Sequence, residues 1–372
     1  MKRTLNLCLA ILAAGIVIAA LPALAQQSQG PITPKPRAPA QKAPSGAIRV
    51  RVEVVRAPVI VVGPKGEPIL DLQQKDFHII DQGVAQTIDS FDIGGEPLSA
   101  VLVFETSSRI AALLPSIQKS AILFTQTVVG PSGDAAMIGY DGSIRRLLPF
   151  TVSHENIEKA ITHMKGGDSG ARLYDALFDA VGLLRNRPAE RRRAIIVLGE
   201  ARDTGSEEKL GEVLREAQLS NIVIYGVGLS PNMAGLRSEP SASGPSPATP
   251  PGTFGMPPMP GTAQTPTSQQ QYAGNIDLLS LAEWAVQNAT AVVKDRPLEV
   301  AATATGGTYQ SAFRDRTIED AVDAIGGELN SQYVLSYRPT GSDTPGYHQI
   351  KVTVDRPGAK VRTRPGYYLE AK

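Results

Sequence analysis

The sequence predicts an α/β fold: a doubly wound, mainly parallel sheet together with a small β-sandwich-like layer built from N- and C-terminal strands. Two observations support this prediction. Between residues 98 and 332, short apolar runs alternate with segments of helical periodicity, which is typical of strands and helices wound around a parallel sheet. Toward both ends of the chain, apolar and polar residues alternate one by one, which indicates half-buried strands.

The first 46 residues are expected to lie outside both layers. A basic start, an apolar stretch and a small-residue site ending at Ala25 predict a secretory signal peptide over 1–25. An uncleaved membrane anchor is the alternative. Residues 26–46 are rich in Pro, Ala and Gln without periodicity, so we expect a disordered linker. The only cysteine, Cys8, lies within the signal peptide, which excludes an intramolecular disulfide and a thiolate metal site.

The remaining residues divide into three parts. We expect an N-terminal β region over 47–95, a domain of alternating strands and helices over 96–332, and C-terminal β strands over 333–372. Strands of the middle part are predicted at 99–104, 135–141, 144–150, 194–199, 222–228 and 308–313. Apolar stripes at helical spacing predict helices at 110–124, 157–164, 173–184, 210–217, 278–286 and 318–329. A capping box beginning at Thr317 is expected to open the last helix.

One stretch of the middle part has a different composition. Residues 231–274 hold 10 of the 29 prolines and only two charged side chains. The stretch also has too few large apolar residues to offset the entropy of ordering the chain. We therefore expect a disordered insert.

Composition and charge exclude several functions. The chain has 37 basic and 36 acidic residues, a net charge of +1, which argues against a nucleic-acid-binding protein. Its four histidines lack paired metal-ligand spacing, and no serine motif or phosphate-binding loop is recognisable, so we expect no enzyme. Five arginines between 185 and 193 form the densest basic run. We interpret them as a solvated helix end and strand start, with a weak contact to an anionic partner as the alternative.

Acidic residues stand where the two most apolar strands end. Glu105 closes the run VLVFE, and Glu200 follows IIVLG. In a doubly wound sheet, ligands bind along the edge formed by the carboxyl ends of the strands. Ser107, Arg109 and Asp203 follow closely in sequence. We therefore expect these residues to form a contact surface.

Several segments resemble von Willebrand factor type A domains, specifically the secreted acidobacterial type. The resemblance covers nearly the whole chain after the signal peptide. It is carried by GEPILDLQQKDFHIIDQGVAQTIDSF, VLVFETSSRI, ARLYDAL, AIIVLGEARDTGS and GYHQIKVTVDRPGAKVRTRPGYY. It implies a type A fold and a protein-interaction module rather than an enzyme.

The resemblance also implies a location for a metal site. Type A domains often bind Mg²⁺ at a metal-ion-dependent adhesion site, the MIDAS, formed by an Asp-x-Ser-x-Ser loop, a Thr from a second loop and an Asp from a third. In this chain the Asp-x-Ser-x-Ser loop has Glu, Ser and Arg at its three ligand positions. The Thr of the second loop is replaced by Ala and the Asp of the third loop by Glu, whereas a further acidic position of the third loop is matched by Asp. These residues are Glu105, Ser107, Arg109, Ala171, Glu200 and Asp203.

These replacements predict a degenerate, metal-free site with no cofactor. Mg²⁺ requires near-octahedral oxygen ligation, and the longer glutamates would overshoot loops built for aspartate. Arg109 adds a permanent positive charge where the cation would bind. We hypothesise that Arg109, paired with Glu105 or Glu200, takes the electrostatic place of the metal, with Arg202 or Arg172 as alternatives.

Two other functions stay open beside metal-free adhesion or scaffolding. In the first, a slipped loop binds Mg²⁺ and the metal bridges to a partner. Its ligands would be Glu105, Ser107, Asp168, Ser169 and Glu200. In the second, the protein is an envelope enzyme. We expect a periplasmic or secreted protein that binds protein partners but no nucleic acid and has no transmembrane segment after signal cleavage.

Overall fold

The computed structural model describes residues 54–94, 96–125, 129, 132–229, 278–288, 293, 296–312, 315–341 and 344–369. The predicted signal peptide (1–25), linker (26–46) and insert (231–274) lie outside the described residues. No helix within the described ranges combines the length and apolar character needed to cross a bilayer.

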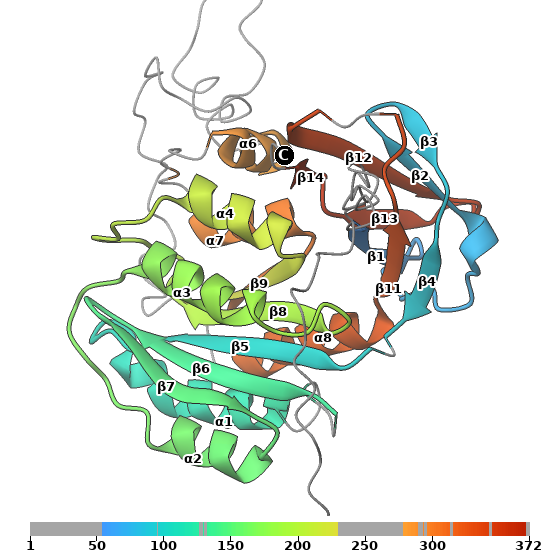
Figure 1. Cartoon of the computed structure of the whole chain (residues 1–372). Helices are drawn as coiled ribbons and strands as arrows, with labels where there is room; N and C mark the ends of the chain where they lie inside the picture. The colour runs from blue at the N-terminus through green and yellow to red at the C-terminus, as the bar shows by residue number, and fades with distance from the viewer. Residues whose placement is uncertain are drawn as a thin grey trace, which may run out of the picture. The chain divides into compact units, whose positions relative to one another are not determined.

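A six-stranded sheet carries the α/β part of the chain. Its strands are β5 (Leu98–Glu105), β6 (Asp134–Tyr140), β7 (Ile144–Thr151), β8 (Arg192–Gly199), β9 (Ile222–Leu229) and β10 (Tyr309–Ala312). Their order in the sheet is β10-β9-β8-β5-β6-β7. All neighbours are parallel except β7, which is antiparallel to β6 (Figure 1). The predicted mainly parallel sheet is therefore confirmed.

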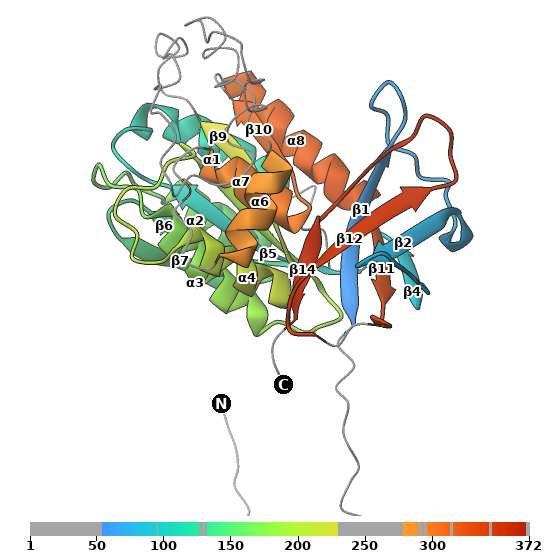
Figure 2. The same cartoon turned by 90° about the horizontal axis from the view of Figure 1, so that it is seen from above.

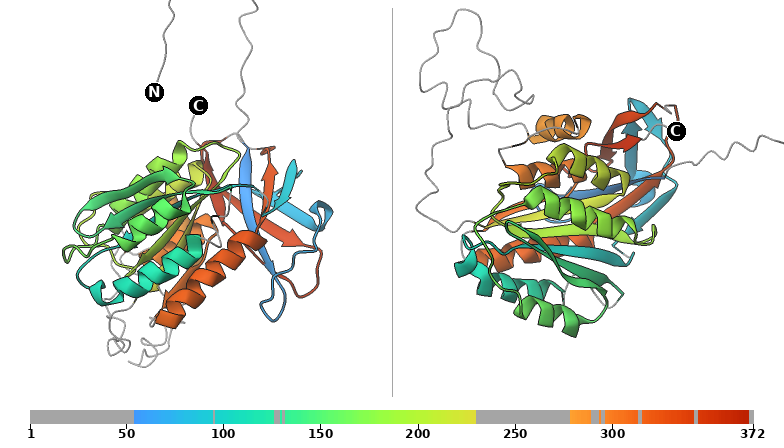
Figure 3. Two further views of the ribbon diagram at one scale, coloured as in Figure 1. Left: turned by 90° about the horizontal axis from the view of Figure 1, so that it is seen from below. Right: turned by 60° about the vertical axis from the view of Figure 1, so that its left-hand side comes forward.

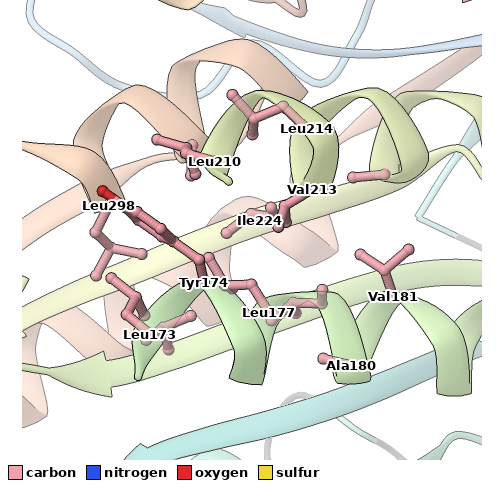
Figure 4. Packing of buried hydrophobic residues seen from close by; sticks show 14 of the residues in the cluster. Leu173, Tyr174, Leu177, Ala180, Val181, Leu210, Val213, Leu214, Ile224 and Leu298 are labelled. Carbon is pink, nitrogen blue, oxygen red and sulfur yellow. The ribbon is translucent and has the colours of Figure 1, made fainter. Parts of the chain in front are cut away.

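Helices cover both faces of this sheet, as a doubly wound fold requires. One face is covered by α1 (Leu114–Phe124), α2 (His154–Thr162) and α8 (Asp315–Ser331). The other is covered by α3 (Leu173–Arg185), α4 (Leu210–Leu219), α6 (Leu278–Gln287) and α7 (Pro297–Thr305). Figure 4 shows α3 and α4 packing against the sheet through buried residues that include Leu177, Val213 and Ile224. Each such side chain, fully buried, contributes about 1.5–3 kcal/mol.

Strands from both ends of the chain form two further four-stranded sheets. The first has the order β13-β1-β11-β4, with β13 (Lys360–Thr363), β1 (Val55–Val62), β11 (Tyr333–Tyr337) and β4 (Ser90–Ile93). The second has the order β14-β12-β2-β3, with β14 (Gly366–Leu369), β12 (Gly346–Val354), β2 (Phe77–Asp81) and β3 (Val84–Gln86). One hydrophobic cluster joins the two sheets, and the rings of Phe77 and Tyr333 lie 5.0 Å apart within it. The predicted β-sandwich-like layer of terminal strands is confirmed (Figures 2 and 3).

Two helices differ from the prediction. Helix α7 was not predicted, because PLEVAATAT consists largely of small residues and is buried on nearly all sides, so it has no polar stripe. Helix α8 begins at Asp315, two residues before Thr317. The prediction that Thr317 caps this helix is therefore wrong.

The arginine run between 185 and 193 is not a solvated patch. Arg187 and Arg191 both pair with Asp134, and Arg191 also donates to Ser99 Oγ at 2.7 Å. The next two arginines donate to backbone carbonyl groups of other elements. Only Arg185 matches the expectation, because its side chain is 61 % exposed. The run therefore fastens loops to the amino-terminal edge of the sheet.

Candidate functional site

The two predicted acidic residues lie side by side at the carboxyl edge of the sheet. Strands β5 and β8 are parallel neighbours, and their register places Phe104 opposite Leu198. Glu105 is the last residue of β5 and is completely buried, whereas Glu200 follows β8 and its side chain is 17 % exposed. One acid therefore belongs to the interior and the other to the rim.

The Glu105 carboxylate is held by hydrogen bonds from its own edge. Ser107 Oγ donates to Oε1 at 2.5 Å, and the backbone N–H of Glu200 donates to Oε2 at 2.5 Å. Burial raises the pKa of Glu105, and these two hydrogen bonds offset part of that effect. A Cβ atom at Gly199 would lie 2.3 Å from the Tyr140 hydroxyl and 2.9 Å from Glu105. Glycine at position 199 is therefore what leaves room for the longer acid.

Arg109 crosses from the loop after β5 to the loop after β8. Its Nε donates to Glu200 Oε2 at 2.6 Å and its Nη2 donates to Oε1 at 2.8 Å. This bidentate pair raises the pKa of Arg109 further above its already high value, mainly through the hydrogen bonds to Glu200. The prediction that Arg109 pairs with one of the two glutamates is confirmed for Glu200. Arg172 instead pairs with Asp175 and Glu207, so that alternative is wrong.

The second and third loops of the predicted site are joined directly. Ala171 and Thr204 form an isolated β-bridge, with Thr204 N donating to Ala171 O at 2.6 Å. Asp203 Oδ1 accepts from the backbone N–H of Tyr174 at 3.1 Å, and Ser206 Oγ donates to the same oxygen at 2.5 Å. Asp203 therefore satisfies a free amide at the N-terminus of α3, where a negative charge is favourable.

Asp168 and Ser169, the two residues that only the slipped-loop alternative assigns to the site, lie on a separate loop. Asp168 Oδ1 accepts from the backbone N–H of Gly142 at 2.7 Å and of Gly170 at 2.8 Å. Its carbonyl oxygen accepts from Ser108 N at 2.7 Å, which attaches this loop to the first one. Ser169 is exposed. Asp168 thus organises the loops around the candidate site.

As these side chains lie, they do not fit Mg²⁺. A magnesium site needs oxygen ligands that converge in near-octahedral geometry. Both oxygens of Glu105 already accept hydrogen bonds, Glu200 is bound by the Arg109 guanidinium, and Asp203 faces α3. In the part of the chain that the structure describes, no group of three or more Asp, Glu, His or Cys side chains could hold a metal ion.

The edge contains a third polar group that was not predicted. Arg145 Nη2 donates to Asp141 Oδ2 at 2.5 Å and to Thr106 Oγ1 at 2.7 Å. Burial raises the pKa of Asp141, but the hydrogen bonds from Arg145 and Ser143 outweigh it, so the pKa is lowered. Asp141 directly follows β6, which adjoins β5 on the side away from β8. Applying the strand-end argument to this third strand would have found it.

Comparison with known proteins finds distant structural likenesses. No protein-family model matches the chain, and no curated protein matches it. An aerotolerance-related membrane protein from Bacteroides fragilis is similar at 13 % identity and a TM-score of 0.39, over 63 % of this chain and 98 % of that one. A von Willebrand factor type A protein from Catenulispora acidiphila is similar at 8 % identity and a TM-score of 0.40, over 77 % and 74 % of the two chains. The VWA domain of SpRpn10 is similar at 10 % identity and a TM-score of 0.36, over 61 % and 94 %. Likenesses at this level say nothing of partners or activity.

Proposed function

We propose that this protein is a metal-independent adhesion or scaffold module that binds a protein partner through the carboxyl edge of its central sheet. The observation that carries the proposal is the bidentate ion pair between Arg109 and Glu200. It sets a permanent positive charge beside the two acids at the position that the type A resemblance assigns to a cation. The rim is therefore ordered without a metal.

The exposed groups of this rim suit a polar protein contact. The side chain of Arg109 is 42 % exposed, and Ser108, Ser169 and Arg202 are exposed around it. Arginine is favoured in protein interfaces because its planar guanidinium can bond to a partner while staying paired. Within the described residues, the Ser107 hydroxyl donates to the Glu105 carboxylate and makes no hydrogen bond to a histidine, so binding is favoured over nucleophilic catalysis.

The predicted chain organisation belongs to the same proposal. A signal peptide at 1–25 would direct export, so the module would act in the periplasm or outside the cell. A linker over 26–46 would tether the folded part, which comprises the β region from 47, the α/β domain over 96–332 with its insert at 231–274, and the strands from 333.

Metal titration tests the first half of the proposal. The chain from residue 26 onward, purified with EDTA and dialysed, is titrated with Mg²⁺ and Mn²⁺ by isothermal calorimetry, and its melting temperature is recorded with EDTA and with Mg²⁺. We expect no binding heat and the same melting temperature in both buffers. Micromolar binding that is abolished by Glu105→Ala would replace the proposal with the magnesium-bridged alternative.

Partner capture tests the second half. The immobilised chain is exposed to envelope extract from its source cells in the presence of EDTA, in parallel with an Arg109→Ala, Arg202→Ala variant. Arg185→Ala serves as the matched control, because Arg185 lies at the opposite end of α3 and is also exposed. We expect one partner to be retained by the wild type and the control and lost by the double variant. Retention by all three, or an enzymatic activity lost on Glu200→Ala, would contradict the proposal.

A further inference from the structure

A cavity of about 320 Å³ opens between β7 and α2, apart from the Arg109–Glu200 pair. Figure 1 shows α2 beside β7 at one side of the central sheet. The cavity is lined by Arg145, Leu147, Ala160, His163, Met164, Lys165 and Gly166. Cationic side chains form one part of this lining and apolar side chains the other, so the cavity is amphipathic.

The cationic part has donors to spare. Lys165 is exposed and makes no ion pair or side-chain hydrogen bond within the described residues. His163 Nδ1 contacts the carbonyl oxygen of Lys159 at 2.7 Å, so its proton is used there and Nε2 of the neutral ring is an acceptor. Arg145 is paired with Asp141, so its charge is largely balanced, and the unbalanced positive charge of the cavity is that of Lys165.

The apolar part is built on the core. Met164 is only 5 % exposed, and the half-buried Leu147 and Ala160 pack against the same hydrophobic cluster that lies under α1, α2 and α8. Such a floor is held rigidly by the sheet behind it. It favours a ligand that brings aliphatic carbon next to its charged group.

The cavity is continuous with the first loop of the candidate site. Arg145 donates to Thr106 Oγ1 at 2.7 Å, and Gly167 N donates to the carbonyl oxygen of Thr106 at 2.6 Å. Thr106 lies between Glu105 and Ser107. The cavity is therefore linked to the first loop of the candidate site through the buried Thr106.

We infer that this cavity binds an acidic side chain of the partner that is flanked by an aliphatic residue. The carboxylate would pair with Lys165 and accept a hydrogen bond from Arg145, and the aliphatic neighbour would cover Leu147 and Met164. A single free cation favours a single carboxylate over a phosphate or a cluster of acids, and the volume suits one or two side chains. The inference rests on the proposed function only in placing a protein on this edge.

A peptide pair tests the inference without the natural partner. The probes are acetyl-Leu-Asp-Leu-amide and acetyl-Leu-Asn-Leu-amide, titrated into the isotopically labelled chain while amide chemical shifts are followed. We expect the acidic peptide to shift residues 145–147 and 163–166, and the neutral one to bind at least about tenfold more weakly. Equal affinity of the two peptides, or no shift at these residues, would overturn the inference.

Two variants identify the cation that is responsible. Lys165→Gln should weaken binding of the acidic peptide by about tenfold, whereas Lys159→Gln, which removes an exposed charge from α2 outside the cavity, should leave the affinity unchanged. Equal effects of both variants would reduce the inference to general charge attraction and so contradict it. Hexanoate is the third probe, and tighter binding of hexanoate than of the peptide would assign the cavity to a small carboxylic acid instead.

The peptide titration tests the cavity assignment and the partner capture tests the proposed function, so either can be contradicted without the other. If the peptide does not bind but Arg109→Ala, Arg202→Ala still loses the partner, the cavity assignment is wrong and the proposed function stands. If the peptide binds the wild type and Lys165→Gln weakens that binding, but the Arg109→Ala, Arg202→Ala variant still retains the partner, the cavity assignment stands and the proposed contact surface is wrong.

Discussion

Arg109 donates to both carboxylate oxygens of Glu200, at 2.6 and 2.8 Å, and so ties the loop after β5 to the loop after β8. Arg109→Ala leaves Glu200 beside the Glu105 carboxylate without a counter-charge. Because Arg109 is 42 % exposed, we expect a loss of only about 0.5–1 kcal/mol in unfolding free energy, measured by urea denaturation. The loss should shrink in 1 M salt, and an unchanged stability at low salt would mean that the pair adds nothing.

Restoring the type A ligand pattern should restore a metal site. The variant combines Glu105→Asp, Arg109→Ser, Ala171→Thr and Glu200→Asp, which shortens both acids and exchanges the guanidinium for a hydroxyl. We expect Mg²⁺ binding by calorimetry in this variant and none in the wild type. Arg109→Ser alone is the control and should not bind. A folded quadruple variant, checked by circular dichroism, that ignores Mg²⁺ would show that the loops have diverged beyond their ligands.

The buried acid predicts a pH dependence of stability. Burial raises the pKa of Glu105 above its ordinary value of 4.5, so the folded state binds the proton more tightly than the unfolded state. The stabilisation from this group is therefore full below pH 4.5 and is lost as the pH rises through the folded-state pKa. Relative to Glu105→Gln, the wild-type unfolding free energy should fall as the pH rises above 4.5. A difference that stays constant or rises with pH would disprove the raised pKa.

Most of the fold could be predicted because periodicity reports burial. Continuous apolar runs such as 99–104 lie in the doubly covered sheet, and alternating runs lie in strands such as β12 with one buried face. Helix α7 could not be predicted, since burial on nearly all sides removes the polar stripe that marks a helix. The arginines near 190 were misinterpreted because sequence gives charge but not the carbonyl groups that a folded chain brings to it.

The sequence predicted the location of the site at the strand ends but not the contacts within it. Glu105 and Glu200 follow buried strands, so their meeting at one edge could be expected. The division between a buried acid and a rim acid could not, because it depends on the space that Gly199 leaves beside Tyr140. The bonding of Asp203 to the N-terminus of α3 also depends on a contact between loops that no spacing in the sequence encodes.

Arg191 is predicted to be a main stabilising residue of the amino-terminal edge. It is 18 % exposed and donates to Ser99 Oγ, to two backbone carbonyl groups and to Asp134. Arg191→Ala removes the donor to Ser99 Oγ and to the two carbonyl groups, whereas Asp134 keeps its pair with Arg187, so we expect a loss of about 2–3 kcal/mol in urea denaturation. Arg185→Ala, at an exposed and longer ion pair of 3.4 Å, should cost less than about 0.5 kcal/mol. Equal losses of unfolding free energy in the two variants would show that Arg191 contributes no more than an exposed ion pair.

A buried carboxylate in the β-sandwich-like layer should couple two tyrosines. Asp81 is 4 % exposed, and its Oδ2 accepts from the hydroxyl groups of Tyr337 at 3.0 Å and Tyr367 at 2.7 Å. We expect Tyr337→Phe and Tyr367→Phe each to cost about 1–2 kcal/mol. The double variant should lose more unfolding free energy than the sum of the two single variants, by at least about 0.5 kcal/mol. Either single variant leaves one tyrosine hydroxyl bonded to the Asp81 carboxylate, whereas the double variant leaves this buried charge with neither.

The control for this cycle is Tyr368→Phe, in the neighbouring position of β14. The Tyr368 ring stacks with Arg215 at 4.3 Å, and within the described residues its hydroxyl makes no hydrogen bond. Tyr368→Phe should therefore lower the unfolding free energy by less than about 0.5 kcal/mol, which is ordinary for a site without buried polar contacts. Denaturation of all four variants at pH 7 completes the cycle. Additive costs for Tyr337 and Tyr367 would mean that Asp81 finds other donors when one hydroxyl is removed, and the coupling through its carboxylate would have to be given up.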